Sequence, residues 1–93
     1  MNFDHTNSGN RGLFEAKEDG RSAGEIIYSK AGENQLVIEH TEVDPEFQGQ
    51  GVGKKLVNKV AEYARENNLK IVPECSYAKK VMQRSSEYDD VLA

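Results

Sequence analysis

The sequence of 93 residues has few of the features that assign a chain to a specialised class. Its one cysteine, Cys75, excludes an intramolecular disulfide, and with only two histidines, at positions 5 and 40, we expect no metal site. No segment approaches the ~20 apolar residues of a membrane span, and the first residues have neither the basic start nor the apolar core of a signal peptide. We therefore expect a cytoplasmic protein that does not bind membranes.

Positive charge is also scarce, with 12 Lys and Arg against 16 Asp and Glu and a formal net charge of −4. Because binding to a phosphate backbone relies on concentrated Lys and Arg, this balance argues against nucleic acid as a partner. The cations gather in two groups, Lys54, Lys55 and Lys59, and then Lys79, Lys80 and Arg84. They either form solvated helix faces or, in one or two cases, meet the phosphates of a ligand.

The length of the chain predicts a single domain over residues 1–93, because a chain of this size builds one modest core. Residues 1–12 are rich in Asn, Ser, Gly and charge, and we expect them to form a loose N-terminal arm that joins the sheet only at its end. We expect a monomer or a weak dimer.

Three segments in the first half of the chain are typical of strands, at residues 13–17, 23–30 and 35–43. Short turns at residues 18–21 and 31–34 separate them, so they predict an antiparallel meander. Alternation in the third strand predicts two faces. One face carries Leu36, Ile38 and His40, and the other carries Val37, Glu39, Thr41 and Val43.

The second half of the chain predicts a strand between two helices. Residues 52–67 carry apolar side chains at helical spacing with a polar opposite face. Residues 69–72 predict a buried strand that stops at Pro73, which cannot donate a ladder hydrogen bond. A second helix is expected over residues 76–84, and the tail is expected to dock as a last strand or a short turn. A right-handed crossover through the helix at residues 52–67 should join the strand at residues 35–43 to the strand at residues 69–72.

The connection before the first predicted helix contains glycines at positions 49, 51 and 53. Glycines there let backbone N–H groups approach a bulky ligand, and the start of a helix adds partial positive charge, so the pattern predicts a phosphate cradle. The spacing excludes a mononucleotide P-loop, because Gln48 and Lys55 stand where a glycine and a hydroxyl are needed. It also excludes a dinucleotide fingerprint, because Lys54 stands at the third glycine.

The spacing does match Q/R-x-x-G-x-G/A, through Gln48-Gly49-Gln50-Gly51-Val52-Gly53, and this resembles the acyl-CoA pyrophosphate loop of the GCN5-related N-acetyltransferases. The preceding V-D-P-E-F of residues 43–47 looks like that family's V-x-P-x-[FY] lead-in. Residues 72–77 and 86–92 resemble the P-x-C-S-Y and P-E-Y-x-x-L segments of its smallest, single-domain members, sometimes called YjdJ-type or minimal N-acetyltransferases. Ser86 departs from the second pattern, where proline is usual. The resemblance covers about residues 13–92.

The resemblance implies an α+β, acyl-CoA N-acyltransferase fold, in which a mixed sheet combines an antiparallel meander with one parallel strand after a crossover helix, and two main helices pack on it. It further implies that the two parallel strands splay apart and that the pantetheine arm of acetyl-CoA (coenzyme A) pairs with the backbone near residues 41–43. The pyrophosphate is expected on the N–H groups of residues 48–54. The expected cofactor-binding residues are Thr41, Val43, Gln48, Gly49, Gln50, Gly51, Val52, Gly53, Lys54 and Lys79.

Two side chains are the candidates for catalysis. Cys75 immediately precedes the second helix, where unpaired N–H groups lower a thiol pKa, and the resemblance places it beside the acetyl group. It either accepts the acetyl group or protonates the leaving thiolate, or it is a small buried apolar residue. His40 is expected in the splay as a general base, unless it is a hydrogen-bonded structural histidine. Tyr77 and Tyr88 either orient a substrate or pack.

The sequence therefore predicts an enzyme, a minimal N-acetyltransferase that transfers acetyl from acetyl-CoA to an unknown amine. A protein amine suits an open cleft better than a small antibiotic does. The alternative is a non-catalytic acyl-CoA-binding or sensing module. A plain interaction domain is a third hypothesis, which the intact glycine loop opposes because glycines near a helix start are unfavourable to order without a reason.

Overall fold

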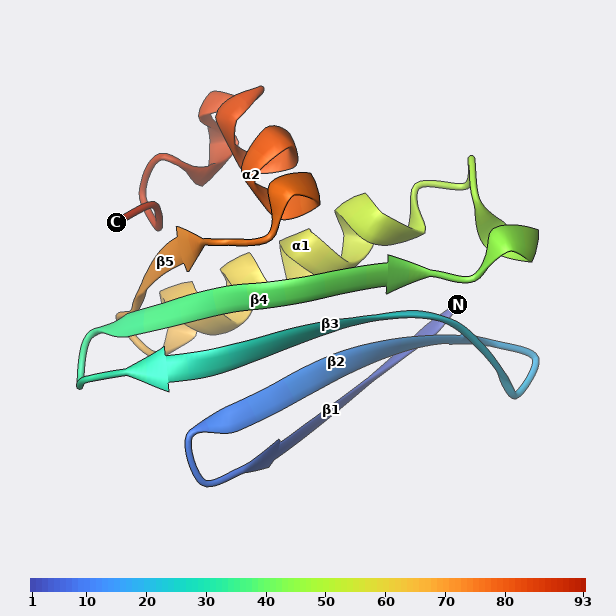
Figure 1. Cartoon of the computed structure of the whole chain (residues 1–93), viewed down its shortest axis with the longest axis horizontal. Helices are drawn as coiled ribbons and strands as arrows, with labels where there is room; N and C mark the ends of the chain where they lie inside the picture. Colours follow the sequence, from blue (N-terminus) through green and yellow to red (C-terminus); the bar gives the residue numbers. More distant parts are fainter.

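The computed structural model describes all 93 residues and shows one five-stranded sheet with two helices. The elements are β1 (Asn2–Ser8), β2 (Arg11–Glu18), β3 (Arg21–Ala31), β4 (Gln35–Val43), η1 (Pro45–Phe47), α1 (Val52–Glu66), β5 (Lys70–Pro73), α2 (Ser76–Gln83) and η2 (Ser86–Tyr88). Strands β1 to β4 are antiparallel neighbours in chain order, and β5 pairs parallel to β4 (Figure 1). The predicted α+β class with a mixed sheet is confirmed.

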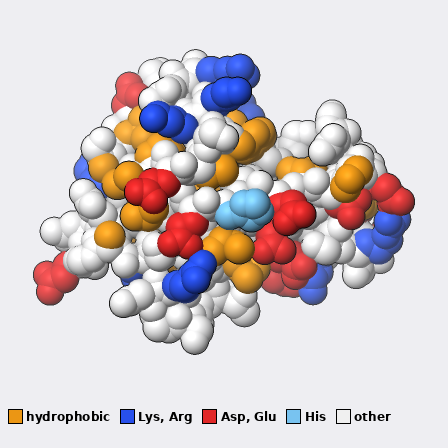
Figure 2. Space-filling model, viewed as in Figure 1, with side chains coloured by type: hydrophobic (Ala, Val, Ile, Leu, Met, Phe, Trp, Pro, Cys, Tyr) orange, Lys and Arg blue, Asp and Glu red, His pale blue; other side chains and the backbone are white.

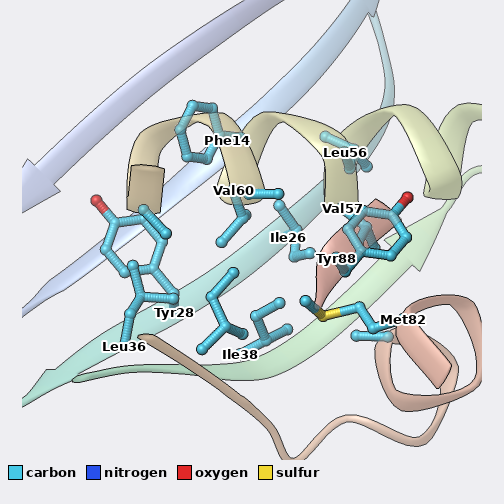
Figure 3. Close-up of a cluster of buried hydrophobic side chains, with 14 of the residues drawn as sticks. Phe14, Ile26, Tyr28, Leu36, Ile38, Leu56, Val57, Val60, Met82 and Tyr88 are labelled. Atoms are coloured by element: carbon cyan, nitrogen blue, oxygen red, sulfur yellow. The ribbon is translucent and has the colours of Figure 1, made fainter. Parts of the chain in front are cut away.

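Helix α1 crosses one face of the sheet and forms the core with it (Figure 1). Its apolar stripe, including Leu56, Val57 and Val60, is fully buried, as expected for an amphipathic helix. Figure 3 shows these side chains among Ile26 and Ile38 of the sheet. Burying each such side chain stabilises the fold by about 1.5–3 kcal/mol, so this stripe is what fixes α1, and the loop before it, against the sheet.

The N-terminus does not form the loose arm expected over residues 1–12. Residues 2–8 form β1, which pairs with β2 along its whole length at the edge of the sheet. Phe3 and His5 face α1, and the His5 ring stacks on Phe14 with 4.0 Å between ring centroids and meets Tyr63 edge-on at 4.8 Å. The composition of the segment predicted disorder, but these aromatic contacts and the ladder hydrogen bonds order it.

The strand pairing contains a bulge that reverses the alternation of β4. Tyr28 pairs with Ile38 and the preceding Ile27 pairs with His40, so Glu39 has no partner on β3. A β-bulge of this kind shifts the following side chains to the opposite face. The predicted faces are therefore wrong beyond Ile38. Thr41 now shares the helix-side face with Leu36 and Ile38, as does Val43, whereas His40 lies on the open face.

The C-terminal tail docks on β5 after the single turn η2. The Ile71 N–H donates to the Val91 carbonyl at 2.6 Å, and Ile71 forms a parallel bridge with Leu92. Arg65 of α1 holds the tail from the other side, with Nε 2.7 Å from Asp90 Oδ2. The predicted short turn and last strand pairing are both present. No helix of the fold combines the length and the apolar character needed to cross a membrane.

Candidate functional site

The site is the opening where β4 and β5 part. Their pairing begins at Gln35 and Lys70 and ends at Ile38 and Pro73, while β4 continues to Val43. Beyond Pro73 the chain turns away, and the N–H groups of Glu74 and Cys75 both donate to the Ile38 carbonyl, at 3.0 and 3.1 Å. Residues 39–43 therefore present a strand edge with no neighbouring strand, and such an edge pairs readily with an extended ligand that carries amide groups.

The loop between β4 and α1 forms one end of this opening. Asp44 stabilises its first turn, since its Oδ1 accepts a hydrogen bond from the Glu46 N–H at 2.9 Å. Gly49 and Gly51 have left-handed φ angles of 84° and 76°, and Gly51 is the N-cap of α1 without any side-chain cap. Only glycine takes this conformation readily, so both residues shape a loop that leads directly into the helix.

The backbone donors of this loop are available to a ligand. Within the chain no hydrogen bond uses the N–H groups of Gly49, Gly51, Val52, Gly53 and Lys54. Free N–H groups and the positive end of the helix dipole together favour an anion at this place. The residues present therefore fit a pyrophosphate. That each predicted loop residue, Gln48 and Gln50 included, contacts the cofactor stays a prediction.

Exposed cations lie on the two helices that border the opening. Lys54 and Lys55 follow it on α1, Lys79 and Lys80 lie on α2, and Arg84 is the C-cap of α2. None of the five forms an ion pair in the chain, in contrast to Lys17, Lys59 and Arg65. Figure 2 shows Lys and Arg side chains gathered over α2. These cations therefore give α2 and the start of α1 positive side chains on an otherwise acidic protein.

Cys75 lies at the inner side of the opening as the N-cap of α2. Its Sγ is 3.5 Å from Thr41 Oγ1, so the two side chains meet across the gap between β4 and α2. Burial raises the pKa of the Cys75 thiol, but the Thr41 hydroxyl, to which the thiol donates a hydrogen bond, and the nearby N–H groups of Ala78, Tyr77 and Thr41 favour the thiolate more strongly and hold the pKa below its ordinary value. The lowered pKa makes the thiol easier to ionise at the place where the thioester of a bound acyl-CoA is expected.

His40 is not brought together with Cys75. The bulge at Glu39 places His40 on the open face, where its side chain is 57% exposed and its Nε2 is 3.5 Å from Glu42 Oε2. Glu25 pairs with Glu42 across the strands, and both line a small hollow of about 190 Å³ at the end of β4. The expectation that His40 faces the splay with Leu36 and Ile38 is wrong, and a role as general base now requires an acceptor on the open face.

The other predicted residues have different positions. Thr41 and Val43 are half-buried at the helix-side face of the opening, and Lys79 is exposed on α2. Sequence reasoning assigned Thr41 to backbone pairing only and missed its side-chain contact with Cys75. No local signal reveals that contact, because it joins two segments 34 residues apart. The largest hollow, about 460 Å³, lies on the open face beside the β1–β2 turn, away from this chemistry.

Comparisons with known proteins agree with this arrangement. A family model described as GCN5-related N-acetyl-transferase matches residues 13–91. The NMR structure of a proposed GCN5-like N-acetyltransferase from Staphylococcus aureus is 40% identical, with a TM-score of 0.73 over 97% of this chain and 87% of that one. A proposed streptothricin acetyltransferase from Bacillus anthracis, crystallised with acetyl coenzyme A, is 28% identical over 84% of this chain and 48% of its own, with a TM-score of 0.68.

A curated protein extends the comparison to an animal. Protein NATD1 of Xenopus tropicalis is 28% identical over 60 residues, which is 64% of this chain and 55% of that protein. The match thus spans only about half the length of the curated relative.

Proposed function

The chain belongs to the GCN5-related N-acetyltransferase family, and from this premise we propose that it binds acetyl-CoA and transfers the acetyl group to an amine. The observation that carries the proposal is the loop before α1, where the N–H groups of Gly49, Gly51, Val52, Gly53 and Lys54 lack partners in the chain. The proposal assigns the cofactor's pyrophosphate to these donors. Lys54 and Lys79 are proposed to add charge on the two helices that border the loop.

The edge of β4 supplies the second half of the proposed binding site. Acetyl-CoA carries two amide groups in its pantetheine arm, and residues 39–43 offer unpaired backbone groups to such an extended chain. Thr41 and Val43 then contribute through their backbone, so their side chains remain free for other contacts. This is why the Thr41 hydroxyl is able to serve Cys75.

The proposed chemistry depends on Cys75. Acetyl-CoA supplies an acetyl group that is already activated as a thioester. The Thr41 side chain and the N–H groups at the start of α2 lower the pKa of Cys75, and the Sγ atom is proposed to act as a nucleophile or as a proton donor. His40 is not proposed as the base for the amine, because it lies on the face opposite to Thr41, which contacts Cys75.

The acceptor is proposed to be a large molecule such as a protein amine. The opening is bordered by exposed residues rather than by a deep cavity. A large acceptor supplies its own binding surface. We further propose that the protein works in the cytoplasm, where a free thiol persists, as a monomer or a weak dimer.

A second candidate is a module that binds acyl-CoA without turnover. The position of His40 favours it, because the base candidate lies on the face opposite to Thr41, which contacts Cys75. Under this alternative Cys75 is structural or becomes acetylated as a readout. Binding then occurs without multiple turnovers.

The testing experiment is a calorimetric titration of the purified protein with acetyl-CoA and with coenzyme A. The proposal expects saturable binding of both, followed by acetyl transfer to an amine in an acceptor screen. Absence of heat and of thermal stabilisation at millimolar acetyl-CoA would refute cofactor binding. Binding without transfer, with an acetyl group on Cys75 in the intact mass, would favour the sensing module.

A further inference from the structure

Gly53 differs from the two glycines before it. Gly49 and Gly51 are left-handed, and a Cβ at either position meets nothing within 4 Å. Gly53 has ordinary helical geometry and is buried, and a Cβ there collides with the phenol ring of Tyr77, whose Cζ lies only 2.6 Å away. A side chain at position 53 therefore requires the exposed ring of Tyr77 to move, whereas at Gly49 and Gly51 the backbone conformation itself disfavours a side chain.

Tyr77 reaches across the site to make this contact. It is the second residue of α2, two residues after Cys75, and its ring lies against the first turn of α1. The side chain is 41% exposed, and no atom of the chain forms a hydrogen bond with its hydroxyl. A buried tyrosine hydroxyl normally has a partner within the protein, as Tyr88 has in Asn58. Tyr77 is exposed, so its hydroxyl needs no partner within the chain, and this hydroxyl lies beside Gly53 in the first turn of α1.

We propose that Tyr77 contacts the cofactor, an inference that rests on acetyl-CoA as the ligand. Its ring forms a wall of the cleft between α1 and α2, and its hydroxyl donates a hydrogen bond to a phosphate oxygen at the first turn of α1. Gly53 leaves room for the hydroxyl end of the ring against this turn. The last glycine of the loop thus serves the tyrosine, while Gly49 and Gly51 serve the path of the backbone.

Two substitutions of Tyr77 separate the ring from the hydroxyl. Tyr77→Phe keeps the wall and removes one exposed hydrogen bond, so acetyl-CoA should bind about threefold more weakly. Tyr77→Ala removes both and should weaken binding about tenfold. The matched control is Gln83→Ala at the exposed end of α2, which should leave the affinity unchanged. If Tyr77→Ala binds acetyl-CoA as tightly as the wild type does, the inference on Tyr77 is wrong while the proposed function stands.

A double-mutant cycle tests the role of Gly53. Gly53→Ala displaces the ring and should weaken acetyl-CoA binding about tenfold in the wild-type background but less than twofold in the Tyr77→Ala background. If Gly53→Ala weakens binding equally in both backgrounds, its Cβ obstructs the phosphate directly and the inference fails. A purely structural contact would instead lower the melting temperature of Tyr77→Ala without changing its affinity.

A measurement without ligand keeps the two proposals distinguishable. In NMR spectra of the free protein, the ring protons of Tyr77 should show a nuclear Overhauser effect to the Gly53 α-protons. Absence of this signal overturns the inference even if the wild type binds acetyl-CoA. Absence of wild-type binding overturns the proposed function and, with it, the part of Tyr77 in holding the cofactor.

Discussion

Replacing Thr41 with valine tests the contact that controls Cys75. Valine keeps the shape and the strand preference of threonine and loses only the hydroxyl, which lies 3.5 Å from the Cys75 Sγ. Because the hydroxyl donates to the thiolate, its loss should raise the pKa of Cys75. A hydrogen bond to a charged group contributes about 1.5–3 kcal/mol, and we take about 1 kcal/mol for this long one to sulfur. Losing about 1 kcal/mol leaves Thr41→Val with roughly fivefold less thiolate than the wild type at pH values below the pKa.

The assay for this prediction is the rate of Cys75 alkylation by iodoacetamide between pH 5 and pH 10, roughly the range around the reference thiol pKa of about 8.5. Thr41→Val should react about fivefold more slowly at neutral pH, with its profile displaced to higher pH. Thr41→Ser retains the hydroxyl and is the control. Acetyl-CoA affinity should be retained in both variants, because the cofactor is proposed to pair with the backbone. Identical profiles for Thr41→Val and the wild type would refute the reasoning.

Three further predictions address the loop, the thiol and the edge strand. Gly51→Glu puts bulk and negative charge among the free N–H groups, so it should abolish acetyl-CoA binding in calorimetry while its circular dichroism spectrum stays native. Asparagine tolerates the left-handed φ of this position, so Gly51→Asn should bind acetyl-CoA better than Gly51→Glu does. Equal binding by the wild type and both variants would contradict the loop assignment. Cys75→Ala should bind acetyl-CoA normally and transfer acetyl more slowly, and full activity would make Cys75 a packing residue. Burial and, secondarily, Lys30 lower the pKa of His5 in the folded protein. The packing of neutral His5 therefore stabilises the fold fully above the pKa of the unfolded chain, about 6.5, and this stabilisation is lost as pH falls through the folded-state pKa. Wild-type melting temperature should therefore fall more than that of His5→Gln between pH 7.5 and pH 5, and parallel losses would argue against this packing.

Much of the fold follows from local pattern. A few neighbouring residues specify the apolar stripe of α1, the turns between strands and the glycine loop. The structure places these features within a few residues of the predicted bounds. Such features depend on periodicity and on backbone preferences, which the neighbouring residues set. The family assignment rests on the same local motif and is confirmed by the comparison over residues 13–91.

The edge strand shows where composition misleads. Residues 2–8 are polar, yet Phe3 and His5 find Phe14 and Tyr63 on elements that come later in the chain. His5 Nε2 also lies 2.6 Å from the Tyr28 hydroxyl. Only the assembled sheet and helix provide these partners, so low apolar content was not sufficient reason to expect a loose arm.

The sequence by itself determined every strand and helix except β1, their order and the glycine loop before α1, because glycine conformations and apolar periodicity act over a few residues. Tertiary structure decided which side chains meet in the site. The bulge at Glu39 arises from the pairing of β4 with β3, and it turns His40 to the open face and Thr41 toward Cys75. Likewise, the ring of Tyr77 lies against Gly53 only because α1 and α2 pack together. Contacts between distant segments depend on the register and packing of the whole sheet, and no local pattern encodes them.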